Sequence, residues 1–259
     1  MQIAHLFLLF MIYSFVGWAY EVLLCSATER SFVNRGFLFG PYCPIYGVGA
    51  LIFIYVLEGA RQNPVLLFFS SMILASALEY TTSLLLEKLF GAKLWDYSHY
   101  KINLNGRISL LASTAFGLFA VLLVFTLHPF VERMLTPLSD LSVVLFSLAL
   151  MMVFLMDMVV SVKQMIAFTS LLKQIEEAVE KSTKQIKDTV QVKIESGKTF
   201  LKALPQSIEL PKINFEHIFR AFPRIKSIQY TESLNKLLEH LAQGKESLAK
   251  VIGRRNNDE

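Results

Sequence analysis

Five long apolar segments constrain the fold of this chain more than any other feature of its sequence. They lie at about 3–25, 42–58, 64–86, 108–128 and 140–162. A transmembrane helix needs roughly 20 mainly apolar residues, so these segments are of the length that crosses a bilayer, and 42–58 is the shortest. Because the chain is also 54% hydrophobic and only 18% charged, the sequence predicts an all-α, polytopic integral membrane bundle of about five transmembrane helices.

The first apolar segment has the length of a secretory signal peptide but not its pattern. It lacks a basic start and a small-residue cleavage pattern, and it carries Glu21. We therefore expect it to remain as a transmembrane helix.

Lysine and arginine are distributed unevenly among the connections between the segments. The first connection carries Arg30 and Arg35, the third carries four basic residues between 88 and 107, and the second and fourth carry one each. Basic connections tend to stay in the cytoplasm. This pattern predicts that the first and third connections and the C-terminal tail are cytoplasmic and that the N-terminus lies outside.

The charges also divide the chain into two parts. Residues 1–162 hold eight Lys/Arg and nine Asp/Glu, whereas 163–259 hold seventeen and twelve. We predict a transmembrane domain at 1–163 and a basic, helical cytoplasmic tail at 164–259. Apolar residues recur in steps of three and four from Leu172 to Ile194, which is typical of an amphipathic helix. Such a tail either lies on anionic lipid or docks a cytoplasmic partner.

A stretch rich in Gly, Pro and aromatic residues, 34–47, separates the first two apolar segments. Its glycines permit backbone conformations that other residues avoid. Pro41 and Pro44 fix φ and remove two N–H donors, and Arg35 adds a permanent charge. We interpret the stretch as a shaped, charged segment that re-enters the membrane. The alternative interpretation is a tight turn between helices with an arginine at the membrane interface.

Three carboxylates are predicted to lie inside the membrane near its cytoplasmic face. At 1.5 Å per residue, Glu21, Glu79 and Asp157 lie ~6, ~10 and ~9 Å from that boundary. A carboxylate in a span costs about 2.5–3.5 kcal/mol, so we expect each to find a partner, with Arg35 and Arg107 available. The alternative is that each acid reaches the headgroups. Trp18 shares a helix face with Glu21 and is either an interface anchor or part of a site.

The third connection, 87–107, is too aromatic and too rich in turn residues for a disordered linker. We expect it to fold back against the first connection. Small residues that follow it, such as Ser113 and Gly117, are typical of closely packed membrane helices. The two histidines of the predicted outer half, His5 and His128, are predicted to be interfacial.

Several kinds of chemistry have no motif in this sequence. It contains no phosphate-binding loop, dinucleotide fingerprint, zinc-protease motif or nucleophile elbow. The five histidines have no metal-ligand spacing, and the two cysteines, Cys25 and Cys43, have no redox spacing. We therefore expect no cofactor, no metal, no nucleic-acid partner and no ATP hydrolysis by this chain alone.

Motifs in the first two thirds of the chain carry a resemblance to a known family. They are Gly17-Trp18 with Glu21, the stretch 34–47, Leu86-Glu87 with Trp95-Asp96-Tyr97-Ser98, and Asn103-Leu104-Asn105-Gly106-Arg107. In order and spacing, about residues 10–165 resemble the bacterial family of ABC-transporter permeases called type IV or CmpB-like. The resemblance implies a multi-pass protein of the bacterial plasma membrane, with a separate nucleotide-binding subunit as a partner besides the lipid bilayer.

The resemblance and the polar pattern together define a set of candidate ligand-binding or functional residues. They are Trp18, Glu21, Asn34, Arg35, Gly36, Gly40, Pro41, Cys43, Pro44, Tyr46, Gly47, Glu79, Glu87, Trp95, Asp96, Tyr97, Asn103, Gly106 and Arg107.

Three functions fit these features. The first is a permease-like transport component with a polar cavity at the cytoplasmic side and no ATPase of its own. The second is an intramembrane enzyme or lipid-headgroup-binding protein, in which a carboxylate acts as general base and the arginines hold an anion. The third is a membrane scaffold whose basic tail recruits partners.

Overall fold

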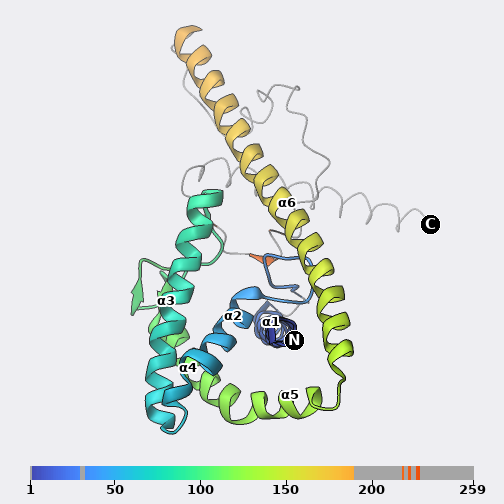
Figure 1. Cartoon of the computed structure of the whole chain (residues 1–259). Coiled ribbons are helices and arrows are strands. Elements are labelled where there is room, and N and C mark those ends of the chain that lie inside the picture. Colours follow the sequence, from blue (N-terminus) through green and yellow to red (C-terminus); the bar gives the residue numbers. More distant parts are fainter. Residues whose placement is uncertain (1, 30–32, 190–217, 219–220, 223–225, 228–259) are drawn as a thin grey trace, which may run out of the picture.

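The computed structural model describes residues 2–29, 33–189, 218, 221–222 and 226–227. Helices dominate it (Figure 1). They are α1 (Gln2–Glu29), α2 (Pro44–Leu51), the π-helical η1 (Ile52–Val56), the 3-10 turn η2 (Glu58–Ala60), α3 (Pro64–Phe90), α4 (Leu110–Leu122), the π-helical η3 (Leu123–Leu127), α5 (His128–Leu135) and α6 (Asp140–Thr189). The strands are β1 (Ala92–Lys93), β2 (Asn103–Leu104), β3 (Ile108–Ser109) and β4 (Lys226–Ser227). The all-α prediction is confirmed.

Among the described residues, four helices are long and apolar enough to cross a membrane. They cover Gln2–Ala27, Pro64–Phe90, Leu110–Leu135 and Asp140–Gln174. The fifth predicted segment, 42–58, is helical only over Pro44–Val56. Thirteen residues rise ~20 Å, which is less than the ~30 Å hydrocarbon core. The structure therefore has four helices of spanning length and one shorter apolar helix in place of the expected five.

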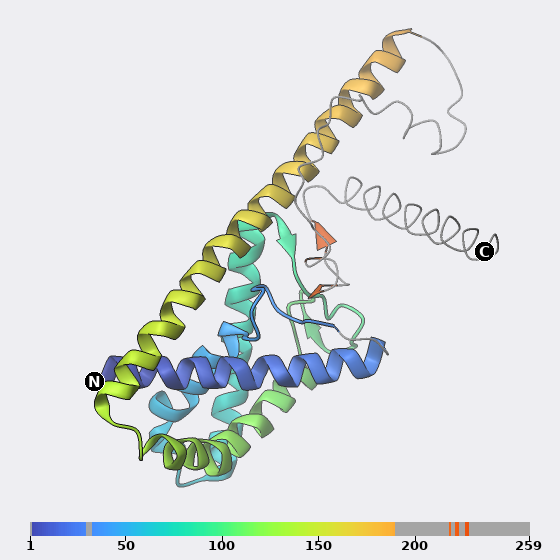
Figure 2. The same cartoon turned by 90° about the vertical axis from the view of Figure 1, so that its right-hand side faces the viewer.

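The first long helix, α1, does not run parallel to α3. Figure 1 shows α1 end-on while α3 and α6 run across the page, and Figure 2 shows the length of α1 passing across α3. The prediction of one common depth for the carboxylates assumed parallel spans. In the structure, the two connections 33–43 and 91–109 bring polar residues of crossed helices together.

Local sequence signals fix the ends of α3. The side-chain oxygen of Asn63 accepts hydrogen bonds from the N–H groups of Val65 and Leu66, and Pro64 occupies the first turn. Both features favour a helix start. At the other end, Gly91 adopts the left-handed conformation, with φ 64°, that terminates many helices.

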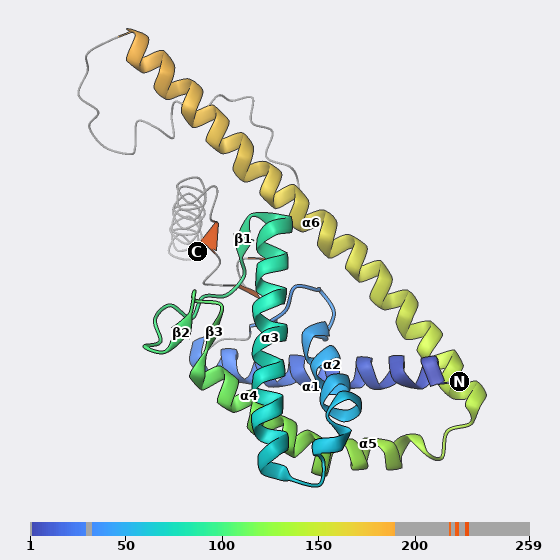
Figure 3. The ribbon, with the colours of Figure 1, turned by 60° about the vertical axis from the view of Figure 1, so that its left-hand side comes forward.

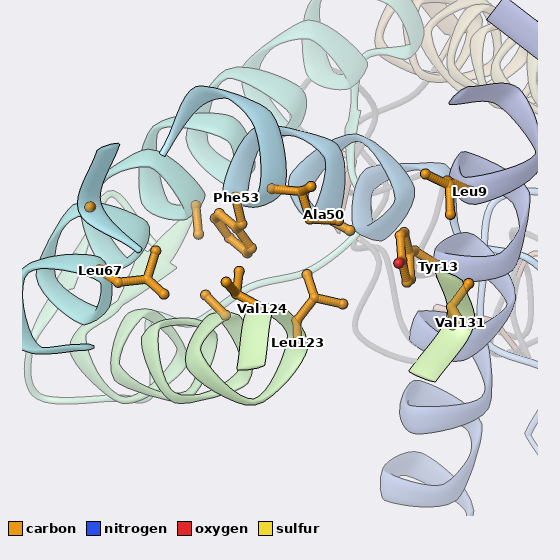
Figure 4. Close-up of a cluster of buried hydrophobic side chains, with 12 residues drawn as sticks. Leu9, Tyr13, Ala50, Phe53, Leu67, Leu123, Val124 and Val131 are labelled. Atoms are coloured by element: carbon orange, nitrogen blue, oxygen red, sulfur yellow. The ribbon is translucent and has the colours of Figure 1, made fainter. Parts of the chain in front are cut away.

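One apolar core joins α1, α2, η1, α3 and the α4–η3–α5 segment. Figure 4 shows Leu9 and Tyr13 of α1 facing Ala50 and Phe53, with Leu67, Leu123, Val124 and Val131 completing the cluster. Two small residues on α4 allow close contact with α3. Ser113 exchanges a 2.7 Å hydrogen bond with Ser76, and a methyl group added at Gly117 would meet the ring of Phe68 at 2.8 Å. The predicted close packing on this face is observed.

A second core forms where α3 ends and α6 passes it. Met165, Phe168, Leu171 and Leu172 of α6 pack with Phe90, Ala92 and Leu94, and with Ile218, Ala221 and Phe222 from the far end of the chain. Strand β4 pairs antiparallel with β1, with Ala92 opposite Ser227 (Figure 3). The chain thus returns to its membrane helices after residue 217. The predicted domain boundary at 163/164 lies inside α6, which continues to Thr189.

Candidate functional site

The stretch 33–43 turns back along α1 before α2 begins. Figure 2 shows this connection running from the end of α1 toward the middle of that helix. The backbone N–H of Cys43 donates to the carbonyl of Ser14, midway along α1, at 2.9 Å. At the start of the stretch, the Trp18 indole N–H donates to Oδ1 of Asn34 at 2.7 Å. Residues 34–43 therefore turn back against the second half of α1, and we call them the re-entrant loop for this course along the helix.

Glycines make the close approach of α2 to α1 possible. A methyl group added at Gly17 would overlap the Tyr46 ring, and one added at Gly47 would overlap the Ser14 hydroxyl and the Phe10 carbonyl. Because only glycine leaves this space, the Gly17 and Gly47 positions let the short helix sit directly on α1.

The carboxylate of Asp157 on α6 binds backbone N–H groups of the re-entrant loop. It accepts hydrogen bonds from the N–H groups of Phe39 at 3.0 Å and Gly40 at 2.7 Å. It also accepts bonds from the hydroxyls of Tyr42 at 2.7 Å and Ser161 at 3.0 Å. This carboxylate finds neutral donors instead of the arginine that we expected. Its role here is to fix the tip of the loop against α6.

Glu21 lies at the centre of the first polar cluster. Its Oε2 is 3.6 Å from Nε of Arg35, and its Oε1 accepts a 2.5 Å hydrogen bond from the Tyr46 hydroxyl. Arg35 also donates to the carbonyl of Ala221 at 3.0 Å and lies 5.5 Å from the ring centre of Phe222. Arg35 therefore joins α1 to the returning segment at 221–222, and Glu21 joins α1 to α2.

Glu79 and Arg107 form a second polar cluster between α3 and the 91–109 connection. The Tyr97 hydroxyl donates to Oε1 of Glu79 at 2.9 Å. Arg107 is buried, forms an ion pair with Glu87, donates to the Ser83 hydroxyl at 3.2 Å and lies over the ring of Tyr80. Among the described residues, Arg107 pairs with Glu87 and not with Glu79.

The 91–109 connection is ordered by its own turn residues. Gly106 has φ +67°, and its N–H donates to Oδ1 of Asn103 at 2.9 Å. The Trp95 indole donates to the Arg107 carbonyl at 3.1 Å, and Asp96 accepts from the hydroxyl of Ser98. These predicted site residues orient the backbone around Arg107. Phe37 of the re-entrant loop and Trp95 of the 91–109 connection pack against the same apolar core.

Tyr97 is where the two clusters meet. Burial raises the pKa of its hydroxyl well above the usual range, the carboxylates of Glu79 and Glu21 raise this pKa further, and the positive charge of Arg35 opposes them. Both acids and Arg35 are therefore close enough to Tyr97 to act on its charge. The polar residues from α1, α3 and both connections therefore lie near one another and make up the candidate site.

A further polar contact lies near the N-terminus of α1 and was missed from the sequence. His128, predicted to be interfacial, is buried and forms a 2.8 Å hydrogen bond with the Tyr13 hydroxyl. His5 lies 3.5 Å from Glu132. His128 is buried because the start of α5 packs against Tyr13 of α1, and no signal in the sequence indicates that contact.

The fold and the site together define a multi-pass helical membrane protein with a polar cluster built on a re-entrant loop. A family model described as "Putative ABC-transporter type IV" matches residues 8–162. The chain belongs to this family, and the predicted resemblance is confirmed. Neither a curated protein nor a solved structure matches the chain.

The family match covers the residues that carry the site. Glu21, Asn34, Arg35, Tyr46, Glu79, Tyr97 and Arg107 lie in the joined clusters. Gly36, Gly40, Pro41, Pro44 and Gly47 shape the loop and the helix start, and Cys43 is buried with its thiol 3.6 Å from the Arg35 carbonyl. The described residues contain no group of three His, Cys, Asp or Glu side chains that could hold a metal ion.

Proposed function

We propose that this chain is a permease-like component of a transporter in the bacterial plasma membrane. Its polar site lies at the cytoplasmic side, and a separate subunit supplies ATP hydrolysis. The observation that carries the proposal is the re-entrant loop, which delivers the start of the short helix α2 to the middle of α1.

Discontinuous helices of this kind suit transport. In many transporters, a half-helix that begins within the membrane exposes N–H groups and bends the chain around a solute site. Irregular backbone is tolerated at that depth only where protein or a water-filled cavity surrounds it. Here Asp157 and Ser14 satisfy N–H groups of the loop. The polar groups beside it are Glu21, Arg35 and Tyr46.

The proposed solute site is lined by the two clusters that meet at Tyr97. It offers the carboxylates Glu21 and Glu79, the hydroxyls of Tyr46 and Tyr97, and Arg35 at its edge. A polar or amphiphilic solute that carries hydrogen-bond donors matches this acceptor-rich set. Movement of the loop relative to Asp157 would open the site.

The geometry supports a lipid-headgroup enzyme less well. That function needs an arginine available to hold an anion, but Arg35 is engaged by Glu21 and the Ala221 carbonyl, and Arg107 by Glu87 and Ser83. An anion would have to displace a carboxylate from each guanidinium. The pairs observed favour a structural and gating role for both arginines.

The test is purification of the tagged full chain from native membranes after mild crosslinking. The proposal predicts recovery of a nucleotide-binding subunit whose ATPase activity rises when it is reconstituted with this chain. Glu21→Gln should reduce that stimulation, whereas the control Glu58→Gln, on the turn η2 outside the proposed site, should not. Repeated purifications without an ATPase, together with tightly bound lipid found by mass spectrometry, would contradict the proposal and favour a lipid-binding function.

A further inference from the structure

Glu79 is the most deeply buried acid of the site. It is 6% exposed, it lies on the membrane helix α3, and its Oε2 has no hydrogen-bond partner among the residues that the structure describes. Its Oε1 accepts one bond, from the neutral hydroxyl of Tyr97. A buried carboxylate normally has both oxygens satisfied, because an unpaired buried charge is strongly unfavourable.

The charges of the site do not balance. Three acids, Glu21, Glu79 and Glu87, face two arginines. Arg35 pairs with Glu21, and Arg107 pairs with Glu87. Within the described part of the chain, no basic side chain forms an ion pair with Glu79.

The groups around Glu79 cannot supply the missing charge. Tyr97 from the connection is a neutral hydroxyl, Ser83 lies one turn further along α3, and Glu21 from α1 is a second acid. Asp157 on α6 is satisfied by donors of the re-entrant loop. Each neighbour is therefore neutral, acidic, or already paired.

We propose that Glu79 is a proton-binding site and holds a dissociable proton on Oε2. A hydronium ion transfers a proton to Oε2 and leaves a water molecule. The side chain then becomes neutral, so the excess negative charge is removed and no metal cation is needed to balance it. Tyr97 continues to donate to Oε1 in both forms. Proton binding to Glu79 would make the charge of the proposed solute site depend on the proton concentration on the side of the membrane to which the site opens. This inference deepens the proposed transport function and rests on it for its physiological meaning.

Infrared spectroscopy of the purified full chain in lipid tests the proposal directly. The probe is the proton itself, supplied by changing pH. Wild-type protein should show a protonated-carboxyl band near neutral pH that disappears in alkali. Glu79→Gln, which keeps an acceptor for Tyr97, should lack that band, whereas the controls Glu21→Gln and Glu87→Gln should retain it.

A second variant separates proton binding from a structural role. Tyr97→Phe removes the hydroxyl that donates to Glu79 and stabilises its ionised form. The protonated-carboxyl band of this variant should therefore persist to higher pH than the band of the wild type. Thermal unfolding of each variant shows whether it folds. Identical spectra for wild type and Glu79→Gln would overturn the proposal, as would a wild-type spectrum without the protonated-carboxyl band near neutral pH. Either result is independent of whether an ATPase partner is found.

Discussion

Single side chains in this protein act mainly by holding the re-entrant loop. Asp157 binds two N–H groups of the loop, Glu21 binds Arg35, and Asn34 binds Trp18. Each bond crosses from one element to another. The polar side chains of the candidate site are thus bonded to one another across elements.

Arg35→Ala should destabilise the protein because it leaves Glu21 half-buried without its cation. Loss of such a partner costs on the order of 1–3 kcal/mol, so the thermal midpoint in detergent should fall. The double variant Arg35→Ala/Glu21→Ala should recover part of that loss, since the stranded charge is gone. Lys101→Ala, at an exposed position, serves as a surface control. If the thermal midpoint of the double variant falls by as much as the two single variants combined, that result would contradict the ion pair between Arg35 and Glu21.

The raised pKa of Tyr97 predicts a specific alkaline behaviour. Burial and the two nearby carboxylates keep its hydroxyl protonated in the folded protein, whereas the unfolded chain ionises tyrosine from about pH 10. The unfolded state therefore binds fewer protons above that pH, and the free energy of unfolding should fall as pH rises. In Tyr97→Phe, the free energy of unfolding should fall less steeply with pH from pH 10 up to the pH at which the protein unfolds. Equal pH slopes for the two proteins would count against the burial of Tyr97.

At the scale of elements, the contact between α1 and α2 positions the loop. The short helix begins beside Ser14 and packs on the first half of α1, so residues 34–43 must cover the second half. Glycines at the contact decide how near the two helices come.

Gly47→Ala should disrupt this contact. The added methyl would lie 2.5 Å from the Phe10 carbonyl, which belongs to a helix backbone and cannot rotate away. Overpacking of this kind costs typically about 1–3 kcal/mol, and thermal unfolding should register it. Gly59→Ala is the matched control, because nothing lies within 4 Å of that position. A midpoint for Gly47→Ala equal to that of the control would show that the helices are further apart.

The sequence predicts most of these elements but not how they cross. Hydropathy located the start of each of the four long helices within a few residues, although α6 continues far beyond residue 162, to Thr189. Asn63-Pro64 and Gly91 mark the ends of α3. The Gly/Pro stretch correctly indicated an irregular loop. Segment length alone could not show that 42–58 is too short a helix to span. The pairing of Arg35 with Glu21 rather than Glu79, and the burial of His128, depend on long-range packing that has no local signal.

At the scale of the whole molecule, the segment that contains Ile218, Ala221 and Phe222 packs over the end of α3 and the middle of α6. Ile218, Ala221 and Phe222 are buried against Phe90, Met165 and Phe168. The Ala221 carbonyl accepts the hydrogen bond from Arg35. The tail segment is therefore part of the membrane domain's structure and lies next to the polar site.

Phe222→Ala should loosen this packing. Removing a buried phenylalanine ring costs roughly 3–5 kcal/mol when the cavity persists, so limited proteolysis should cut the chain near residue 222 faster than in wild type. Ile102→Ala, at a position that is 65% exposed, is the control. Cleavage at the wild-type rate would mean that the returning segment contributes little to stability.

The central claim is that residues 34–43 re-enter along α1, so that Cys43 lies beside Ser14 and not at the end of that helix. Oxidative crosslinking in membranes tests it, in a Cys25→Ser background that leaves Cys43 as the single native thiol. Ser14→Cys should form an intrachain disulfide with Cys43, because the two backbones are hydrogen-bonded at 2.9 Å and a disulfide needs Cα atoms about 4.4–6.8 Å apart. Ala27→Cys, some 20 Å further along α1, should not. A disulfide to position 27 and none to position 14 would mean that 42–58 starts at the membrane surface as an ordinary helix, and would contradict the account.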